Sequence, residues 1–215
     1  MKVLVIGANG QIGQILIDQL QQSEYYEPIA MIRNVEQQSK FEEKGVQTVV
    51  GDLEGSVKDL EMAMQGVDAI VFTAGSGGKT GPDKTLLVDL DGASKTIEAA
   101  ENLAVKRYIM VSAIQAHNRE NWSEQIKPYF VAKHHADRIL ANSTLDFTIV
   151  RPGILVNETA TGKIKIAENL ERSTITRADV ASTIVSVLKA ENTLKKSFDL
   201  INGETEIEVA VKAFE

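Results

Sequence analysis

The sequence predicts an α/β fold in which helices cover both faces of a doubly wound parallel sheet. Short apolar runs rich in β-branched residues alternate with longer segments whose apolar residues recur every three or four positions. Such alternation is typical of βαβ units, whose strands lie parallel in one sheet. The first apolar run also ends at a glycine-rich turn that leads directly into a helical pattern.

The elements follow one another along the chain. The expected strands are residues 2–6, 28–32, 46–50, 69–73, 107–111 and 147–150. The expected helices are residues 11–22, 35–44, 57–64, 84–102 and 127–141. Beyond residue 151 we expect a short strand within 162–169, a helix over 177–189, a last strand within 197–203 and a final helix over 204–214.

Two helices carry more detailed predictions. Asp83 is expected to cap the long helix 84–102 at its N-terminus. The buried side of that helix is predicted to consist of Leu86, Leu87, Leu90, Ile97 and Ala100. Thr176, with Asp179 three residues later, is expected to cap helix 177–189.

Composition and charge narrow the function classes. Asp and Glu number 30 and Lys and Arg 23, so the net charge is −7, and this argues against general nucleic-acid binding. The chain has no cysteine, which excludes disulfides and thiolate sites, and we expect no metal site. No apolar run approaches the roughly 18 residues that span a bilayer. We therefore expect a cytoplasmic protein without a membrane partner.

The turn after the first strand, GANGQIG, has the form of a phosphate cradle. We expect Gly7 to permit the tight turn, Gly10 to let a pyrophosphate approach bare backbone, and Gly13 to let the helix pack on the strand. The start of the helix would present free N–H groups and a positive dipole end to the phosphates. The alternative is an ordinary glycine-rich turn. We predict a dinucleotide site, lined also by the intervening residues Asn9, Gln11 and Ile12.

The end of the second strand favours NADP over NAD. An NAD site usually places an acid about 20 residues after the glycines to bind the ribose 2′-hydroxyl. Arg33 stands there instead and fits a 2′-phosphate, unless it is only a solvated arginine at a strand end. After the third strand, Asp52 is positioned to meet the adenine amino group or merely to cap the following turn.

Further candidates follow later strands, since ligands bind at the carboxyl ends of such sheets. Thr73, Ala74 and Gly75 follow the fourth strand. The Gly-Lys-Thr at 78–80 does not complete a triphosphate-binding loop, because that loop needs a glycine at position 73. Ser112 follows the fifth strand, and 151–154 the sixth.

Tyr129 and Lys133 are four residues apart on the expected helix 127–141 and so share one face. An unrelated pair on an amphipathic helix is the alternative interpretation. His117 and Trp122 lie in a polar loop expected to border a substrate cleft. Trp122 either covers a substrate or anchors its own loop, and the sequence does not separate these two roles.

Taken in order, the motifs GANGQIG, MIRN, GDL, TAG, VSA, YFVAK, RPG and TRADVA resemble those of the atypical short-chain dehydrogenase/reductases, close to the NmrA-like and NAD-dependent epimerase/dehydratase families. The resemblance covers nearly the whole chain. It implies a Rossmann-type doubly wound sheet. It also implies that residues 1–215 form a single NAD(P)-binding domain in which 151–215 contribute a small substrate-side part.

The resemblance also implies roles for individual residues. Tyr129 would exchange a proton with the substrate oxygen, Lys133 would lower the pKa of that tyrosine and hold the nicotinamide ribose, and Ser112 would hydrogen-bond the substrate carbonyl. The turn after the fourth strand would lie beside the cofactor. The remaining cofactor contacts implied are Leu53 at the adenine and Pro152, Gly153 and Ile154 near the nicotinamide.

Two departures from the family pattern affect the functional prediction. Asp89 stands where extended members carry a catalytic asparagine, and only a short segment follows residue 151. We expect an NADPH-dependent oxidoreductase that transfers hydride to a small carbonyl or quinone-like substrate. The alternatives are an NADP-binding regulator or redox sensor with a protein partner and, less favoured, a sugar-nucleotide epimerase or dehydratase. A monomer or homodimer is expected.

Overall fold

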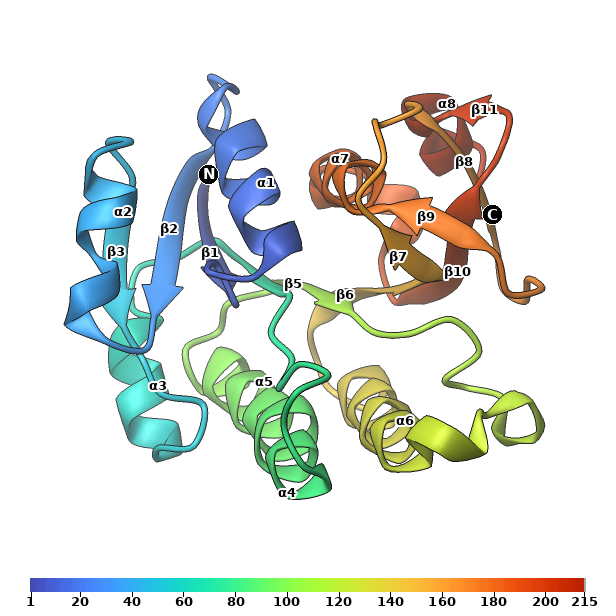
Figure 1. The fold of residues 1–215 in the computed structure, drawn as a ribbon. Coiled ribbons are helices and arrows are strands. Elements are labelled where there is room, and N and C mark those ends of the chain that lie inside the picture. The colour runs from blue at the N-terminus through green and yellow to red at the C-terminus, as the bar shows by residue number, and fades with distance from the viewer. Residues whose placement is uncertain (215) are drawn as a thin grey trace.

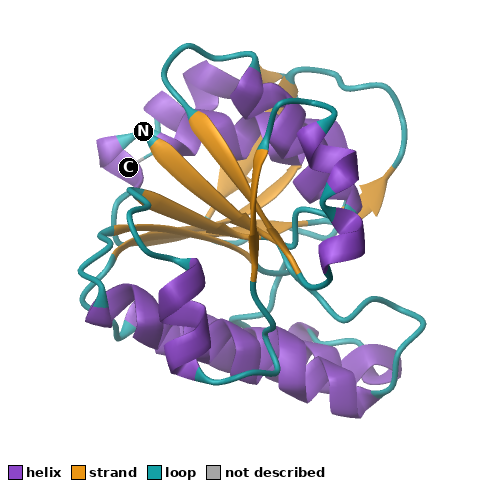
Figure 2. Cartoon of the chain, turned by 90° about the vertical axis from the view of Figure 1, so that its left-hand side faces the viewer, coloured by secondary structure: helices purple, strands orange, loops and turns teal. Residues whose placement is uncertain are grey.

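The computed structural model describes residues 1–214 and contains a nine-stranded sheet covered by helices on both faces (Figures 1 and 2). Its strands are β1 (Lys2–Ile6), β2 (Glu27–Ile32), β3 (Gln47–Val50), β4 (Ala69–Phe72), β5 (Arg107–Val111), β6 (Asp146–Pro152), β8 (Lys163–Ala167), β10 (Lys196–Asn202) and β11 (Thr205–Glu206).

The strand order is β11-β8-β10-β6-β5-β4-β1-β2-β3. Every pair from β10 to β3 is parallel, whereas β8 pairs antiparallel with β10 and with β11. Two short strands, β7 (Ile154–Val156) and β9 (Thr174–Thr176), pair parallel with each other in a separate sheet. The predicted doubly wound α/β fold is confirmed, and an antiparallel edge that was not predicted extends it.

The helices are α1 (Gln11–Gln21), α2 (Ser39–Glu42), α3 (Val57–Ala63), α4 (Pro82–Lys84), α5 (Ala93–Asn102), α6 (Lys127–Ala141), α7 (Arg177–Leu188) and α8 (Ile207–Lys212). One core lies between the sheet and α1, α2, α7 and α8, with Leu16 and Ile184 at its centre. The other lies under α3, α5 and α6 and includes Leu60, Ile97 and Leu140. Burying each such side chain stabilises the fold by about 1.5–3 kcal/mol.

The expected helix 84–102 is not a single α-helix. Its middle, Thr85–Gly92, is a π-helix between α4 and α5, and its N-cap is Gly81 rather than Asp83. Because a π-turn contains an extra residue, side chains leave the register of an ordinary helix. Leu86 and Leu87 are consequently 56% and 38% exposed, so the prediction that they are buried is wrong. Asp89, in contrast, is 1% exposed.

Helix α7 is fixed at both ends. At its start the Asp179 N–H donates to Thr176 Oγ1 over 2.9 Å, which confirms the predicted cap. At its end the buried Arg107 of β5 donates to the carbonyl oxygens of Val187 and Leu188. Burial lowers the pKa of Arg107 to about 10, which leaves the side chain charged at neutral pH. The first residues of α7 therefore have a well-defined position relative to the sheet.

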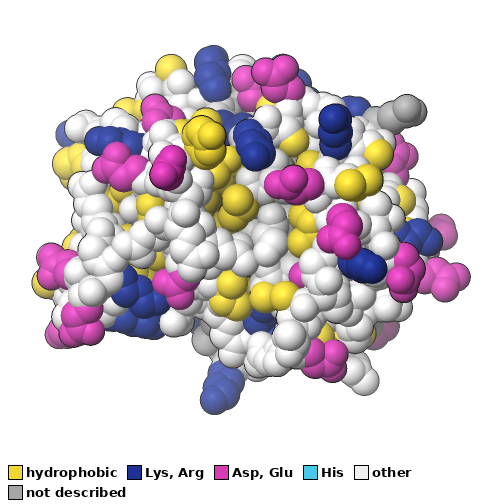
Figure 3. All heavy atoms as spheres, turned by 90° about the horizontal axis from the view of Figure 1, so that it is seen from above, with side chains coloured by type: hydrophobic (Ala, Val, Ile, Leu, Met, Phe, Trp, Pro, Cys, Tyr) yellow, Lys and Arg dark blue, Asp and Glu magenta, His cyan; other side chains and the backbone are white. Residues whose placement is uncertain are grey.

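Acidic and basic side chains are interspersed on the face seen in Figure 3 and do not gather into one large patch of either sign. Within residues 1–214, we find no helix with the length and apolar character required to cross a membrane.

Candidate functional site

The candidate site lies where β1 and β4 run side by side at the centre of the sheet, and its first part is the turn after β1. Gly7 has a φ of +89°, a conformation that favours glycine. A Cβ on Gly7 would also lie 2.6 Å from the backbone nitrogen of Ala74, in the turn after β4. The two strand ends therefore meet closely, as an open α/β sheet requires at its ligand-binding crevice.

Helix α1 starts directly from this turn. The Gly10 N–H donates to the Gly7 carbonyl oxygen over 2.9 Å, and no side chain caps the N-terminus of the helix. The first N–H groups of α1 are thus left without intrahelical partners, as a phosphate site requires. A Cβ on Gly13 would overlap the Gly7 carbonyl oxygen, so glycine is needed there for the helix to approach the strand.

A cavity of about 270 Å³ lies beside this turn. It brings together many of the residues predicted to bind the cofactor: Gly7, Asn9, Gly10, Arg33, Asp52, Leu53, Thr73, Ala74 and Gly75. Sequence reasoning missed other lining residues, among them Met31, Gln37, Gly51, Glu54 and Val88. Met31 and Gly51 belong to the motifs MIRN and GDL, whereas Gln37, Glu54 and Val88 lie outside the quoted motifs and reach the cavity only through the fold.

Arg33 and Asp52 both line this cavity and are exposed. The Arg33 backbone N–H donates to Gln37 Oε1 over 3.0 Å, and within residues 1–214 the guanidinium forms no ion pair. Asp52 Oδ1 accepts the Glu54 N–H over 3.0 Å. The aspartate thus caps its turn and also lines the cavity, so the two alternatives from the sequence are not exclusive.

A second cavity, of about 600 Å³, shares Thr73, Ala74 and Gly75 with the first. The residues predicted to be catalytic, Ser112, Tyr129 and Lys133, all line it. Ile12 and Pro152 line it as well. The glycine-rich turn lines the first cavity and the Ser–Tyr–Lys group lines the second, and the two cavities adjoin at Thr73–Gly75.

Four of the predicted cofactor residues line neither cavity: Gln11, Gly13, Gly153 and Ile154. Ile154 is 59% exposed. Gly153 is confined by the backbone, because a Cβ there would overlap the Ser173 carbonyl oxygen. Gly13 and Gly153 therefore shape the backbone around the site, and the cofactor contacts of Gln11 and Ile154 stay predictions.

Lys133 and Asp89 form a buried ion pair beside the tyrosine. Lys133 Nζ lies 3.3 Å from Asp89 Oδ1 and 5.7 Å from the centroid of the Tyr129 ring. Asp89 Oδ2 accepts the Ser76 N–H over 2.9 Å, which ties the ion pair to the loop after β4. The Oγ of Ser112 is buried and has no hydrogen-bond partner among the described residues. Ser112 lines the second cavity, so its hydroxyl is one of the polar groups available to hydrogen-bond a ligand there.

The pKa shifts follow from burial and from this ion pair. Burial, the largest effect, raises the pKa of Tyr129 above its usual 10.0; Lys133 lowers it by less, and Asp89 and Asp137 raise it further. Burial alone would lower the pKa of Lys133, but attraction to Tyr129, Asp89 and Asp137 outweighs it and raises that pKa. Lys133 therefore acts on Tyr129 in the expected direction, but burial and the two carboxylates outweigh it, so the net pKa of Tyr129 lies above its usual value.

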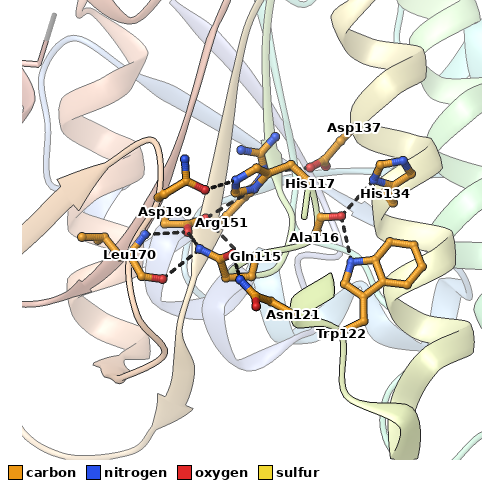
Figure 4. A network of polar contacts seen from close by, with 11 residues as sticks. Gln115, Ala116, His117, Asn121, Trp122, His134, Asp137, Arg151, Leu170 and Asp199 are labelled. Atoms are coloured by element: carbon orange, nitrogen blue, oxygen red, sulfur yellow. Dashed lines mark hydrogen bonds and ion pairs between the residues drawn. The ribbon is translucent and has the colours of Figure 1, made fainter. Parts of the chain in front are cut away.

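The loop after β5 is held by a polar network (Figure 4). The fully buried Asp199 of β10 accepts hydrogen bonds from the Gln115 side chain and the Leu170 N–H over 2.9 and 3.1 Å. Trp122 Nε1 donates to the Ala116 carbonyl oxygen over 3.1 Å, and its ring stacks on Phe130. Trp122 therefore anchors its loop, and it does not line the second cavity.

One cationic residue that lines the second cavity was not predicted from the sequence as a site residue. Arg177, the first residue of α7, lines it together with Leu155. The motif TRADVA contains Arg177, but a motif match alone does not show which side chain faces the cavity.

Comparisons with known proteins agree with this geometry. The family model described as NAD(P)H-binding matches residues 7–191. A Bacillus subtilis protein named as an uncharacterized sugar epimerase, YhfK, is 55% identical, with 99% of each chain covered. The crystal structure of the oxidoreductase YlbE from Lactococcus lactis is 35% identical with a TM-score of 0.91, covering 99% of this chain and 96% of that one.

A more distant solved structure is that of ChuY, an anaerobilin reductase from Escherichia coli O157:H7. It is 26% identical, has a TM-score of 0.80, and the match covers 96% of this chain and 99% of that chain. The resemblance to NAD(P)-binding reductases and epimerase-like proteins is confirmed. On the family match over residues 7–191, this chain belongs to the NAD(P)H-binding family.

Proposed function

We propose that the protein is an NADPH-dependent reductase of a small carbonyl or quinone-like compound, with Tyr129 as the proton donor. The observation that carries the proposal is the buried, unpartnered Oγ of Ser112 in a cavity that also contains Tyr129 and Lys133. A serine hydroxyl in that position has a donor to offer to a substrate oxygen.

The residues present fit a nicotinamide dinucleotide. The free N-terminus of α1 and the close glycine backbone suit a pyrophosphate, and the first cavity suits the adenosine half. When bound, the reduced nicotinamide supplies the hydride. Lys133 lines the second cavity, and its ammonium would donate a hydrogen bond to a hydroxyl of the nicotinamide ribose.

The protein's own part in the reaction is to bind and protonate the substrate oxygen. Ser112 donates a hydrogen bond to the carbonyl oxygen and so stabilises the negative charge that grows there as hydride reaches the carbon. Tyr129 gives its phenolic proton to that oxygen, which completes an alcohol, and then recovers a proton from solvent. With a pKa raised above 10.0, the Tyr129 phenol carries its proton at neutral pH and is able to donate it to the substrate oxygen.

Replacing Asp89 should shift the pH at which reductase activity is lost. Reduction requires protonated Tyr129, so activity persists through neutral pH and falls as the pH rises through the pKa of Tyr129. Because Asp89 contributes to raising that pKa, an Asp89→Asn variant should lose activity at a lower pH than the wild type. The measurement is kcat/KM for reduction across pH. Asp91→Asn, on the exposed side of the same helix, is the control, and coinciding profiles for all three proteins would contradict the role of Asp89.

Cofactor choice is tested at Arg33. Removing a charged donor to a 2′-phosphate costs about 1.5–3 kcal/mol, so Arg33→Ala should weaken NADPH binding about 10- to 100-fold and leave NADH binding unchanged. Binding is measured by nucleotide fluorescence. Lys40→Ala removes a nearby cation that does not line the cavity and should change neither affinity. Equal weakening of NADPH and NADH by Arg33→Ala would contradict a 2′-phosphate contact.

The function itself is tested by NADPH oxidation over a panel of aldehydes, ketones and quinones, with NADPH binding measured in parallel. Turnover that depends on Tyr129 would support the reductase. Tight NADPH binding without turnover of any compound would favour a nucleotide-binding regulator.

A further inference from the structure

The second cavity contains a cation, Arg177, that forms no ion pair with an acidic side chain of residues 1–214. Asp89 and Lys133 pair with each other, so their charges are balanced within the wall. Arg177 also lines the cavity, and among the described residues its side chain makes one hydrogen bond, from Nη1 to Asn157 Oδ1 over 2.8 Å. That partner is a neutral amide, and the charge of the guanidinium remains available to a ligand.

The acids that adjoin Arg177 or its partner Asn157 in the sequence do not neutralise the charge of Arg177. Asp179, in the same first turn of α7, is fully buried and accepts the N–H groups of Thr161 and Gly162 and the Thr176 hydroxyl, each over 2.9 Å. Its carboxylate is therefore satisfied by the chain itself. Glu158, beside Asn157, is exposed and forms no ion pair with Arg177 within residues 1–214.

The backbone at Arg177 is held by contacts at both ends of α7. The cap made by Thr176 fixes the first turn of α7, and Arg107 holds the far end of the helix to β5. Arg177 belongs to the second cavity and does not line the first, which contains Arg33. The rest of the second cavity wall is largely apolar and includes Val111, Ile126, Pro128 and Leu155.

Building on the reductase proposed above, we propose that Arg177 binds an anionic group of the substrate. The substrate class is then a carbonyl compound with an apolar body and a carboxylate or similar anion. The planar guanidinium suits such a group because it donates two parallel hydrogen bonds. The apolar wall accommodates the body of the molecule while Ser112 and Tyr129 receive its carbonyl oxygen.

The test compares 4-formylbenzoate with its neutral analogue 4-formylbenzamide by calorimetry on the protein saturated with NADP⁺, where no reduction takes place. We expect the wild type to bind the acid more tightly than the amide, and Arg177→Gln to weaken binding of the acid about 10- to 100-fold with little effect on the amide. Arg177→Lys should weaken it less. Arg138→Gln makes the same change of charge on the exposed side of α6 and should have no effect.

Three results would overturn the proposal. The first is equal binding of acid and amide by the wild type. The second is an Arg177→Gln variant that binds the acid as well as the wild type. The third is a loss of NADP⁺ affinity of tenfold or more in Arg177→Gln, which would assign Arg177 to a cofactor phosphate. Because the experiment measures binding without turnover, these results can be interpreted even if the protein proves not to be a reductase.

Discussion

Replacing Tyr129 with phenylalanine should reduce kcat for reduction by about 10²–10⁴-fold, the usual contribution of a positioned general acid. The variant lacks only the phenolic hydroxyl, so the ring still packs beside Lys133 and Phe130. We therefore expect NADPH affinity and the melting temperature to stay close to those of the wild type. The measurement is NADPH oxidation with the best substrate of the panel, under saturating cofactor.

The matched control for this variant is Tyr25→Phe, since Tyr25 is 79% exposed and lines neither cavity. It should retain full activity. If Tyr129→Phe turned over its substrate at the wild-type rate, Tyr129 would not be the proton donor. A water or another hydroxyl in the second cavity would then have to supply the proton.

A Gly13→Val substitution should have the second large effect, on both cofactor binding and stability. A side chain at residue 13 would overlap the carbonyl oxygen of Gly7, so α1 must move away from β1. Overpacking of this kind costs about 1–3 kcal/mol, which corresponds to a fall in melting temperature of about 2–4 °C for each kcal/mol. Displacing the start of α1 should also weaken NADPH binding at least about tenfold.

Ala160→Val serves as the control, because Ala160 is exposed and lines neither cavity. Its melting temperature and NADPH affinity should match those of the wild type. A Gly13→Val protein with unchanged NADPH affinity would show that the start of α1 does not hold the phosphates, whatever its effect on stability.

Sequence patterns predicted the regular elements well where local and tertiary preferences agree. The bounds of β1, β5 and α6 match the predicted ranges, because a buried apolar run or an amphipathic helix defines each of them. The predicted cofactor residues meet at the first cavity because the carboxyl ends of parallel strands necessarily lie along one edge.

The remaining features depend on contacts that no local pattern encodes. The burial of Asp89 follows from a π-helix, for which the residues of Thr85–Gly92 carry no evident signal. Arg177 faces the second cavity because α7 is capped at one end and bound by Arg107 at the other. The anchoring of Trp122 likewise depends on a carbonyl oxygen six residues away in an irregular loop.

The π-helix has a consequence for insertions and deletions in this part of the chain. Removing one residue from Thr85–Gly92 would restore ordinary helical spacing and rotate the preceding turn by about 100° relative to α5. If α5 kept its position, with Ile97 in the core, this rotation would turn Asp89 away from Lys133 and Ser76. The additional residue thus lets one continuous helix both cover the sheet and place a carboxylate beside Lys133.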